Sequence, residues 1–300
     1  MSKHPVNKRA EAGHDTLGQE RDTGMTGLVF GAIMPHGHMA IAEAAGPDER
    51  ELGHATQQAM AEIGRRFDAA KPDVTIIVTP HNVHVEGHMA VITAGKLSGS
   101  LSNWTNENIE LNGATDLALA RASLEALNAA GIPTVGVSYG GNDSASATMP
   151  MDWAVLIPLW YAGGRAQPPV PVVVVCPARD MSPETHVKAG QVLAQAAAAS
   201  GKRVAFIGSS DQGHAHREGP PYGYHPAAAE YDTRVVDIVR RNKLGELLDI
   251  PRELLSNAKA DSFWQMLMLH GALGDDWQGE LLSYEVPTYF GMLCAAYQPG

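Results

Sequence analysis

Cysteine is scarce in this sequence, and long apolar runs are missing. The 300 residues include two cysteines, Cys176 and Cys294, and no CxxC pair, which excludes a disulfide framework and a zinc ribbon. No apolar stretch reaches the roughly 18 residues that a membrane-spanning helix needs. The N-terminus is polar and lacks the apolar segment of a secretory signal. These absences predict a cytoplasmic protein.

Positive charge is also in short supply. The chain carries 22 Lys and Arg against 33 Asp and Glu, a net charge of −11, and no basic stripe stands out from that average. Nucleic acid and anionic membranes are therefore excluded as partners. The motifs HExxH, GxxxxGK[ST] and GxGxxG are absent as well. These absences argue against common zinc hydrolases and nucleotide-binding folds.

Apolar residues make up 44 % of the chain, which is enough for a sizeable core. Residues 1–24 are charged and without periodicity, so we predict a disordered tail there and one domain over 25–300. Short apolar runs, bounded by turn residues, alternate with longer helical patterns. Strands are predicted at 28–33, 74–78, 89–93, 134–137, 170–176 and 204–208, and helices at 48–70, 114–130, 183–200, 226–247 and 250–273. This alternation predicts an α/β fold with a central, mostly parallel or mixed sheet and helices on both faces.

Histidine, by contrast, is abundant, with 13 in the chain. Three predicted strands run into histidine loops: PHGH at 35–38, PHNVH at 80–84 and DQGHAH at 211–216. Ligands of open α/β sheets bind at the carboxyl ends of the strands, so parallel strands would bring these loops to one edge. Imidazole ligates iron, zinc, copper and nickel, and two histidines with one carboxylate suit non-haem Fe(II). The sequence therefore predicts a metal site at that edge.

The order of these motifs resembles the catalytic subunits of class III (LigB-like) extradiol ring-cleavage dioxygenases, a superfamily that also includes Memo-like proteins. PHG at 35–37 and TPH at 79–81 are similar to its histidine motifs. MPMDWAVLIPL at 149–159 is similar to its LDHG…PL segment, and GSSDQGH at 208–214 to its SGDLSH. DSFW at 261–264 and LHGAL at 269–273 resemble its C-terminal ligand helix. The likeness covers about residues 27–297 and implies a LigB-like single domain.

The resemblance implies a ligand set for Fe(II). His36 and His81 match the two iron histidines. The third ligand is Glu in the dioxygenases, and the matching position here is Asp261. Aspartate is one methylene shorter, so its backbone would have to lie closer to the metal. Glu230 and Glu285 are the alternative carboxylates.

Acid–base and substrate-binding roles follow from the same resemblance. His214 matches the acid–base histidine, and His84 is a second catalytic candidate. Some members have a catalytic His after the Asp of DHG, whereas this chain has Trp153. The acid–base role at that position is therefore lost or passes to another group, and the Trp153 ring can instead wall a substrate pocket. The substrate-binding residues expected are His38, Trp153, His216, Tyr222 and Tyr224.

Structural roles are the alternative for several of these residues. His36 can cap the turn that follows it, and Asp261 can be the N-cap of a helix that begins at 262, a position where Asp is favoured. His38, His84 and His216 can be loop histidines that hydrogen-bond to the backbone.

The leading prediction is a non-haem Fe(II)-dependent extradiol dioxygenase of aromatic catabolism, which cleaves a catecholic or aminophenolic ring with O2. Two alternatives stay open: a Memo-like protein that binds metal or partners without catalysis, and a Zn-dependent hydrolase on the same scaffold. The expected partners are a small phenolic substrate and O2. A homo-oligomer, a dimer or higher, is expected, and the resemblance leaves open a small partner subunit.

Overall fold

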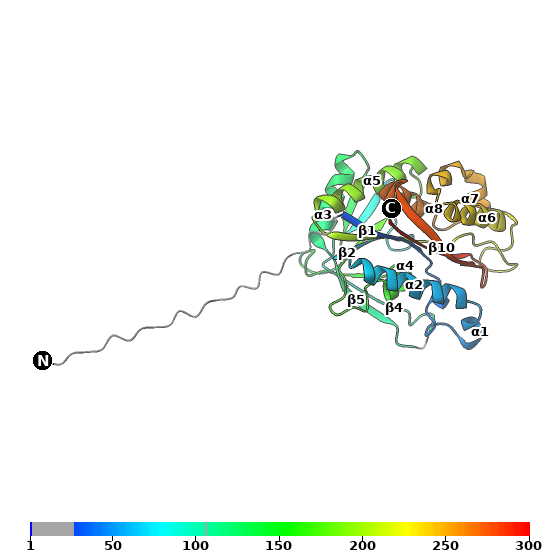
Figure 1. The fold of residues 1–300 in the computed structure, drawn as a ribbon, viewed down its shortest axis with the longest axis horizontal. Helices are drawn as coiled ribbons and strands as arrows, with labels where there is room; N and C mark the ends of the chain where they lie inside the picture. Colours follow the sequence, from blue (N-terminus) through cyan, green and yellow to red (C-terminus); the bar gives the residue numbers. More distant parts are fainter. Residues whose placement is uncertain (2–26, 106) are drawn as a thin grey trace.

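The computed structural model describes Met1, residues 27–105 and residues 107–300. Apart from Met1, the predicted tail lies outside these ranges. The described chain is built around an eight-stranded sheet, and a three-stranded sheet lies against α4 (Figure 1). The strands are β1 (Gly27–Met34), β2 (Val74–Val78), β3 (Met89–Ile92), β4 (Lys96–Ser100), β5 (Glu110–Ala114), β6 (Thr134–Val137), β7 (Thr148–Pro150), β8 (Val172–Cys176), β9 (Arg203–Ser209), β10 (Trp277–Glu285) and β11 (Met292–Pro299).

Helices separate most of these strands. They are η1 (His38–Ala40), α1 (Pro47–Arg50), α2 (His54–Ala70), α3 (Leu117–Ala129), α4 (Trp153–Tyr161), α5 (Pro183–Ala199), α6 (Ala227–Arg240), η2 (Leu244–Asp249), α7 (Arg252–Ala258) and α8 (Phe263–Leu273). No helix of the described residues is both long and apolar enough to cross a membrane.

The large sheet is mixed, as predicted. Its strand order is β10-β11-β1-β9-β2-β8-β3-β6. Strands β1, β9, β2 and β8 run parallel to one another, whereas β11 and β3 run antiparallel to β1 and β8. Because β1, β9 and β2 are neighbours with the same direction, the loops that follow them leave the sheet at the same edge.

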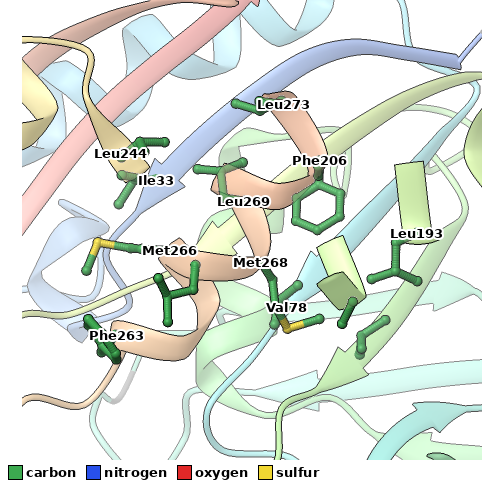
Figure 2. Close-up of a cluster of buried hydrophobic side chains, with 14 of the residues drawn as sticks. Ile33, Val78, Leu193, Phe206, Leu244, Phe263, Met266, Met268, Leu269 and Leu273 are labelled. Carbon is green, nitrogen blue, oxygen red and sulfur yellow. The ribbon is translucent and has the colours of Figure 1, made fainter. Parts of the chain in front are cut away.

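Side chains of the central strands alternate between two hydrophobic cores, as the two-residue period of a strand requires. Ile33 of β1 enters the core formed with α3, α5, α6 and α8, while Phe30 and Met34 enter the core formed with α2 and α4. Figure 2 shows the first core, where Leu269 of α8 and Phe206 of β9 belong to the same apolar cluster. The predicted α/β architecture with helices on both faces is therefore confirmed, and it explains why the strands are continuously apolar.

Helices α5 and α8 cross at two glycines. A Cβ atom on Gly190 would lie 2.0 Å from the carbonyl oxygen of Met268, and one on Gly271 would lie 1.9 Å from that of Val187. The backbones approach this closely because neither glycine has a side chain. The crossing fixes α8, and with it the residues that immediately precede α8, against the sheet.

Several predicted boundaries were wrong. The helix expected at 48–70 is two helices, because the chain breaks at 51–53 and α2 begins after Gly53. The helix expected at 250–273 is also two, because Lys259 takes the left-handed conformation (φ 53°) and ends α7. The helix expected at 226–247 ends at Arg240 and is followed by η2. Strands β4, β5, β7, β10 and β11 and helix α4 were not predicted.

Candidate metal centre

Loops after three neighbouring parallel strands supply most polar groups of the candidate site. His36 lies two residues beyond β1, His81 three beyond β2 and Asp211 two beyond β9. A fourth group, Asp261, comes from the connection between α7 and α8. The convergence expected from the strand ends is therefore present in the fold.

His36, His81 and Asp261 form a cluster with metal-ligand spacing. One ligand atom from each residue lies within 4.8 Å of the other two. Oδ2 of Asp261 is 3.1 Å from Nε2 of His81 and 3.4 Å from Nε2 of His36. Two imidazoles and one carboxylate are a donor set that suits non-haem Fe(II) and leaves coordination positions open.

A hydrogen-bond chain sets the tautomer of His36. Oγ of Ser209 lies 2.6 Å from the carbonyl oxygen of Ala154 and 3.0 Å from Nδ1 of His36. A carbonyl oxygen only accepts, so the Ser209 hydroxyl donates its hydrogen to Ala154 and accepts one from Nδ1–H of His36. In the neutral ring the lone pair is then on Nε2, the atom directed at Asp261. Metal-ligating histidines are held by such a hydrogen bond on the other ring nitrogen.

Nε2 of His36 is a buried polar atom without a hydrogen-bond partner among the described residues. The residue is 1 % exposed, and Nε2 lies 3.4 Å from carboxylate oxygens of both Asp211 and Asp261. Burial by itself would lower the pKa of His36, but the negative charges of Asp211 and Asp261 raise it above its ordinary value. The site therefore favours positive charge at its centre, and a divalent cation bound to the free Nε2 fits that requirement.

His81 is oriented from the start of α4. Its backbone N–H donates to Oγ1 of Thr79 (3.3 Å), and the Thr79 hydroxyl donates to Asp152 (3.1 Å). Asp152 is also the N-cap of α4, where it accepts from the N–H of Val155. Trp153 stacks on the His81 ring, with centroids 4.5 Å apart and planes at 27°. The Asp-Trp pair therefore braces the His81 loop and restricts its ring.

Asp261 lies before α8 but does not cap it. Ser262 is at the N-cap position and makes no side-chain capping bond, while Oδ1 of Asp261 accepts from the Arg179 guanidinium at 2.7 Å. Burial alone would raise the pKa of Asp261, but the neighbouring His36 and His81 rings hold it far below its usual range. Arg179 thus occupies one carboxylate oxygen and leaves the other to face the two histidines.

His214 lies across the cavity as a potential proton acceptor. Its Nδ1 is 2.8 Å from the carbonyl oxygen of Gln212, so Nδ1 carries the hydrogen and Nε2 of the neutral ring has a lone pair. Burial lowers its pKa below the ordinary value, which keeps the ring neutral at neutral pH. The ring stacks on Phe290, with centroids 5.2 Å apart.

The cluster and Asp211 line a cavity of about 180 Å³. His38, Trp153, His214 and Tyr222, all expected from the sequence, line it. Three aromatic residues that the sequence analysis missed also line it: Trp104, Tyr289 and Phe290. Their rings add flat aromatic surface to a lining that also contains the polar groups.

Three predicted site residues lie outside this cavity. His84 is exposed and Tyr224 is 54 % exposed, and neither lines it. Nε2 of His216 is 2.8 Å from the buried carboxylate of Asp232, so this histidine braces its own loop. The alternative carboxylates are also engaged elsewhere: Glu230 pairs with Arg234, and Glu285 accepts from the N–H of Thr56.

Two polar residues of the site escaped the sequence analysis. Asp211 appeared there only as part of the segment 211–216, yet one carboxylate oxygen accepts from the backbone N–H of His36 and the other faces its ring. Arg179 was not considered. Both follow strands of the parallel set, β9 and β8, so the strand-end rule that identified the histidines would also have found them.

The fold and the site together define an α/β protein with a two-histidine, one-carboxylate metal centre. Residues 31–293 match the family described as the catalytic LigB subunit of aromatic ring-opening dioxygenase. This match spans most of the chain, and the protein belongs to that family.

Individual relatives are more distant. Over 254 residues the chain is 23 % identical to Protein CA_C1420 of Clostridium acetobutylicum, an alignment that covers 84 % of this chain and 54 % of the relative. The chain thus spans about half the length of that curated relative. Among solved structures it is similar to the uncharacterized protein JW3007 from Escherichia coli K12, with a TM-score of 0.56 and 17 % identity over 89 % of this chain and 99 % of the other. The structural likeness supports the fold.

Proposed function

We propose that this protein is a non-haem Fe(II)-dependent extradiol dioxygenase, which cleaves a catecholic or aminophenolic ring with O2. The observation that carries the proposal is the cluster of His36, His81 and Asp261, whose ligand atoms lie within 4.8 Å of one another at the base of an aromatic cavity. Membership of the LigB family supports the same class of chemistry.

The donor set favours iron. Three protein ligands leave other coordination positions free, which a two-histidine, one-carboxylate face provides and a closed structural site does not. When bound, Fe(II) would offer open coordination positions to the ring donors and to O2, and it would relay electrons from the ring to O2. The ligand oxygen is Oδ2 of Asp261, because Oδ1 is held by Arg179.

The protein's own groups bind the ring and move protons. Nε2 of His214 accepts the proton of a phenolic O–H and returns it when an oxygen leaving group needs it, a double role that suits a histidine. Trp153, which stacks on His81, and Phe290, which stacks on His214, also line the cavity. These rings hold a planar substrate by stacking and keep water from the reacting atoms.

Trp153 also favours a second candidate, a Memo-like protein that binds metal without ring cleavage. It stands where some dioxygenases have a catalytic histidine, and it stacks directly on His81. Under this alternative the metal centre is retained, but the cavity has one proton-transfer group fewer than those enzymes.

The test is anaerobic Fe(II) reconstitution of the full chain, followed by air and a panel of catechol, protocatechuate, gallate and 2-aminophenol. Oxygen uptake with a yellow ring-opened product that requires Fe(II) would support the proposal. Iron bound at one per chain without turnover of any ring would favour the Memo-like alternative. Turnover of a hydrolysable ester or amide with Zn, without O2, would identify a hydrolase. A chain that binds no iron would refute the proposal.

A further inference from the structure

A second cavity adjoins the metal centre. Its volume is about 410 Å³, within the usual range for small-molecule sites. It shares three lining residues with the metal cavity: His214, Tyr222 and Asp261. A molecule whose ring lies against His214 in the first cavity can therefore extend a substituent into the second.

Positive charge converges on this second cavity in a protein whose net charge is −11. Arg252 at the start of α7, Lys259 at its end and Arg179 after β8 line it, against one lining carboxylate, Asp261. Arg179 is paired with Asp261, whereas neither Arg252 nor Lys259 forms an ion pair with another described residue. Hydrogen bonds from its own backbone and from Ser182, and then the charge of Arg252, lower the pKa of the exposed Glu184, but Glu184 does not line the cavity.

Most of the remaining wall is apolar. Leu255 of α7 and Phe263 and Trp264 of α8 line it, and the Arg179 guanidinium lies over the Trp264 ring at 5.1 Å from its centroid. An apolar floor with two uncompensated cations at the rim matches a short hydrocarbon stem that ends in an anion. It does not match an uncharged or cationic ligand, which would leave the cations without a counter-charge.

We propose that this cavity binds an anionic substituent of the substrate, with Arg252 and Lys259 as its counter-charges and Trp264 beneath its stem. The inference rests on the proposed function for the position of the ring. It narrows the substrate class to phenolic rings that carry an acidic side chain, rather than bare catechol.

The first test measures binding without catalysis. The full chain without added metal is titrated with 3-phenylpropionate, with (2-phenylethyl)phosphonate and with the neutral isostere 3-phenylpropionamide, and Trp264 fluorescence is recorded, with Trp264→Phe to assign the signal. We expect at least one anion to bind about tenfold more tightly than the amide, with a preference that weakens as salt rises. The tighter anion identifies the acidic group as carboxylate or phosphonate-like.

Variants locate the site. Each of Arg252→Gln and Lys259→Gln should weaken anion binding by about 3- to 5-fold, the usual range for an exposed ion pair, and the double variant should abolish the preference over the amide. Arg121→Gln, an exposed arginine on α3, is the matched control and should leave binding unchanged. Equal affinity for acid and amide, or an equal loss in the Arg121 variant, would overturn the proposal.

A second measurement separates this inference from the proposed function. The reconstituted enzyme is assayed with catechol and with 3-(3,4-dihydroxyphenyl)propionate. Higher kcat/KM for the acid, with the advantage lost in the double variant, supports both proposals. Cleavage of catechol with no advantage for the acid would overturn the anionic subsite alone. Anion binding that needs Arg252 and Lys259, in a chain that cleaves no ring, would retain the subsite and refute the dioxygenase.

Discussion

The two adjoining cavities are built from different parts of the fold. The metal cavity is lined by His36, His81 and Asp211, which follow the strands of a buried parallel sheet. The cationic cavity is lined mainly by side chains of α7 and α8 and of the turn between them, with its charges exposed on long stems. Asp261 belongs to both. Under the two proposals, the buried cavity at the strand ends carries the chemistry and the exposed cavity between helices selects the molecule.

The largest expected effect comes from removing the residue that the cavities share. Asp261→Ala should lower iron binding from one per chain to nearly none and reduce ring cleavage by about a thousandfold or more, because two neutral imidazoles hold Fe(II) poorly without a carboxylate. Iron content and oxygen uptake measure this. Glu230→Ala, an exposed acidic residue on α6, is the control. Full iron content in Asp261→Ala would mean that another carboxylate, with Asp211 the first candidate, is the ligand.

The next effect is confined to the metal cavity. His214→Gln should retain iron but reduce kcat by about 10²- to 10⁴-fold, the usual contribution of a general acid–base group. Stopped-flow turnover and iron content are measured together, with the exposed His88→Gln as control. An unchanged kcat would show that proton transfer does not pass through Nε2 of His214, and loss of iron would show a structural role instead.

A smaller effect is expected where the cavities meet. Arg179→Gln removes the guanidinium that holds Oδ1 of Asp261, so iron affinity should fall about 10- to 100-fold, as for other groups that orient a metal ligand. Arg179→Lys should recover part of the loss. Competition with a chelator gives the affinity. If Arg179→Gln changed anion binding but not iron affinity, Arg179 would belong functionally to the cationic cavity alone.

The smallest effect concerns folding and lies outside both cavities. Burial lowers the pKa of His186 on α5, and the hydrogen bond that its Nδ1–H donates to the carbonyl oxygen of Ser182 only partly offsets this effect. The unfolded chain, with a His pKa of about 6.5, therefore takes up the proton first as pH falls. The free energy of unfolding should decrease below about pH 6.5, by at most about 1.4 kcal/mol per pH unit for this group.

Urea unfolding of His186→Gln at pH 7.5, 6.5 and 5.5 checks this prediction, with His88→Gln as the exposed control. The His186 variant should show a shallower decrease than wild type. An unchanged slope would mean that the acid sensitivity has another source. This measurement is also a control for assays on the two cavities, because it separates pH effects on activity from loss of the fold.

Much of the site could be predicted from local sequence. His36, His81 and His214 each stand in a loop after an apolar run, and parallel strands that lie side by side place such loops together. Asp261 was recognised from its resemblance to a family motif. Its surroundings could not be predicted, because the break between α7 and α8 depends on the left-handed Lys259 and on tertiary packing.

His84, His216 and Tyr224 show the limit of the same reasoning. Each is near His81 or His214 in sequence, but proximity along a loop does not determine which side chain faces the cavity. His216 is held instead by Asp232 from α6, a residue sixteen positions further along the chain. Phe290 and Tyr289, more than seventy positions from His214, reach the cavity from the connection before β11.

The sequence by itself determined the α/β class, the central parallel strands and the histidine loops, because these follow from local apolar runs and the residues that end them. Tertiary structure alone decided that Arg179 meets Asp261, that Trp153 stacks on His81, and that Arg252 and Lys259 line a cavity beside the metal centre. Such contacts join segments far apart in the chain. They depend on how helices pack across the sheet, which no local pattern specifies.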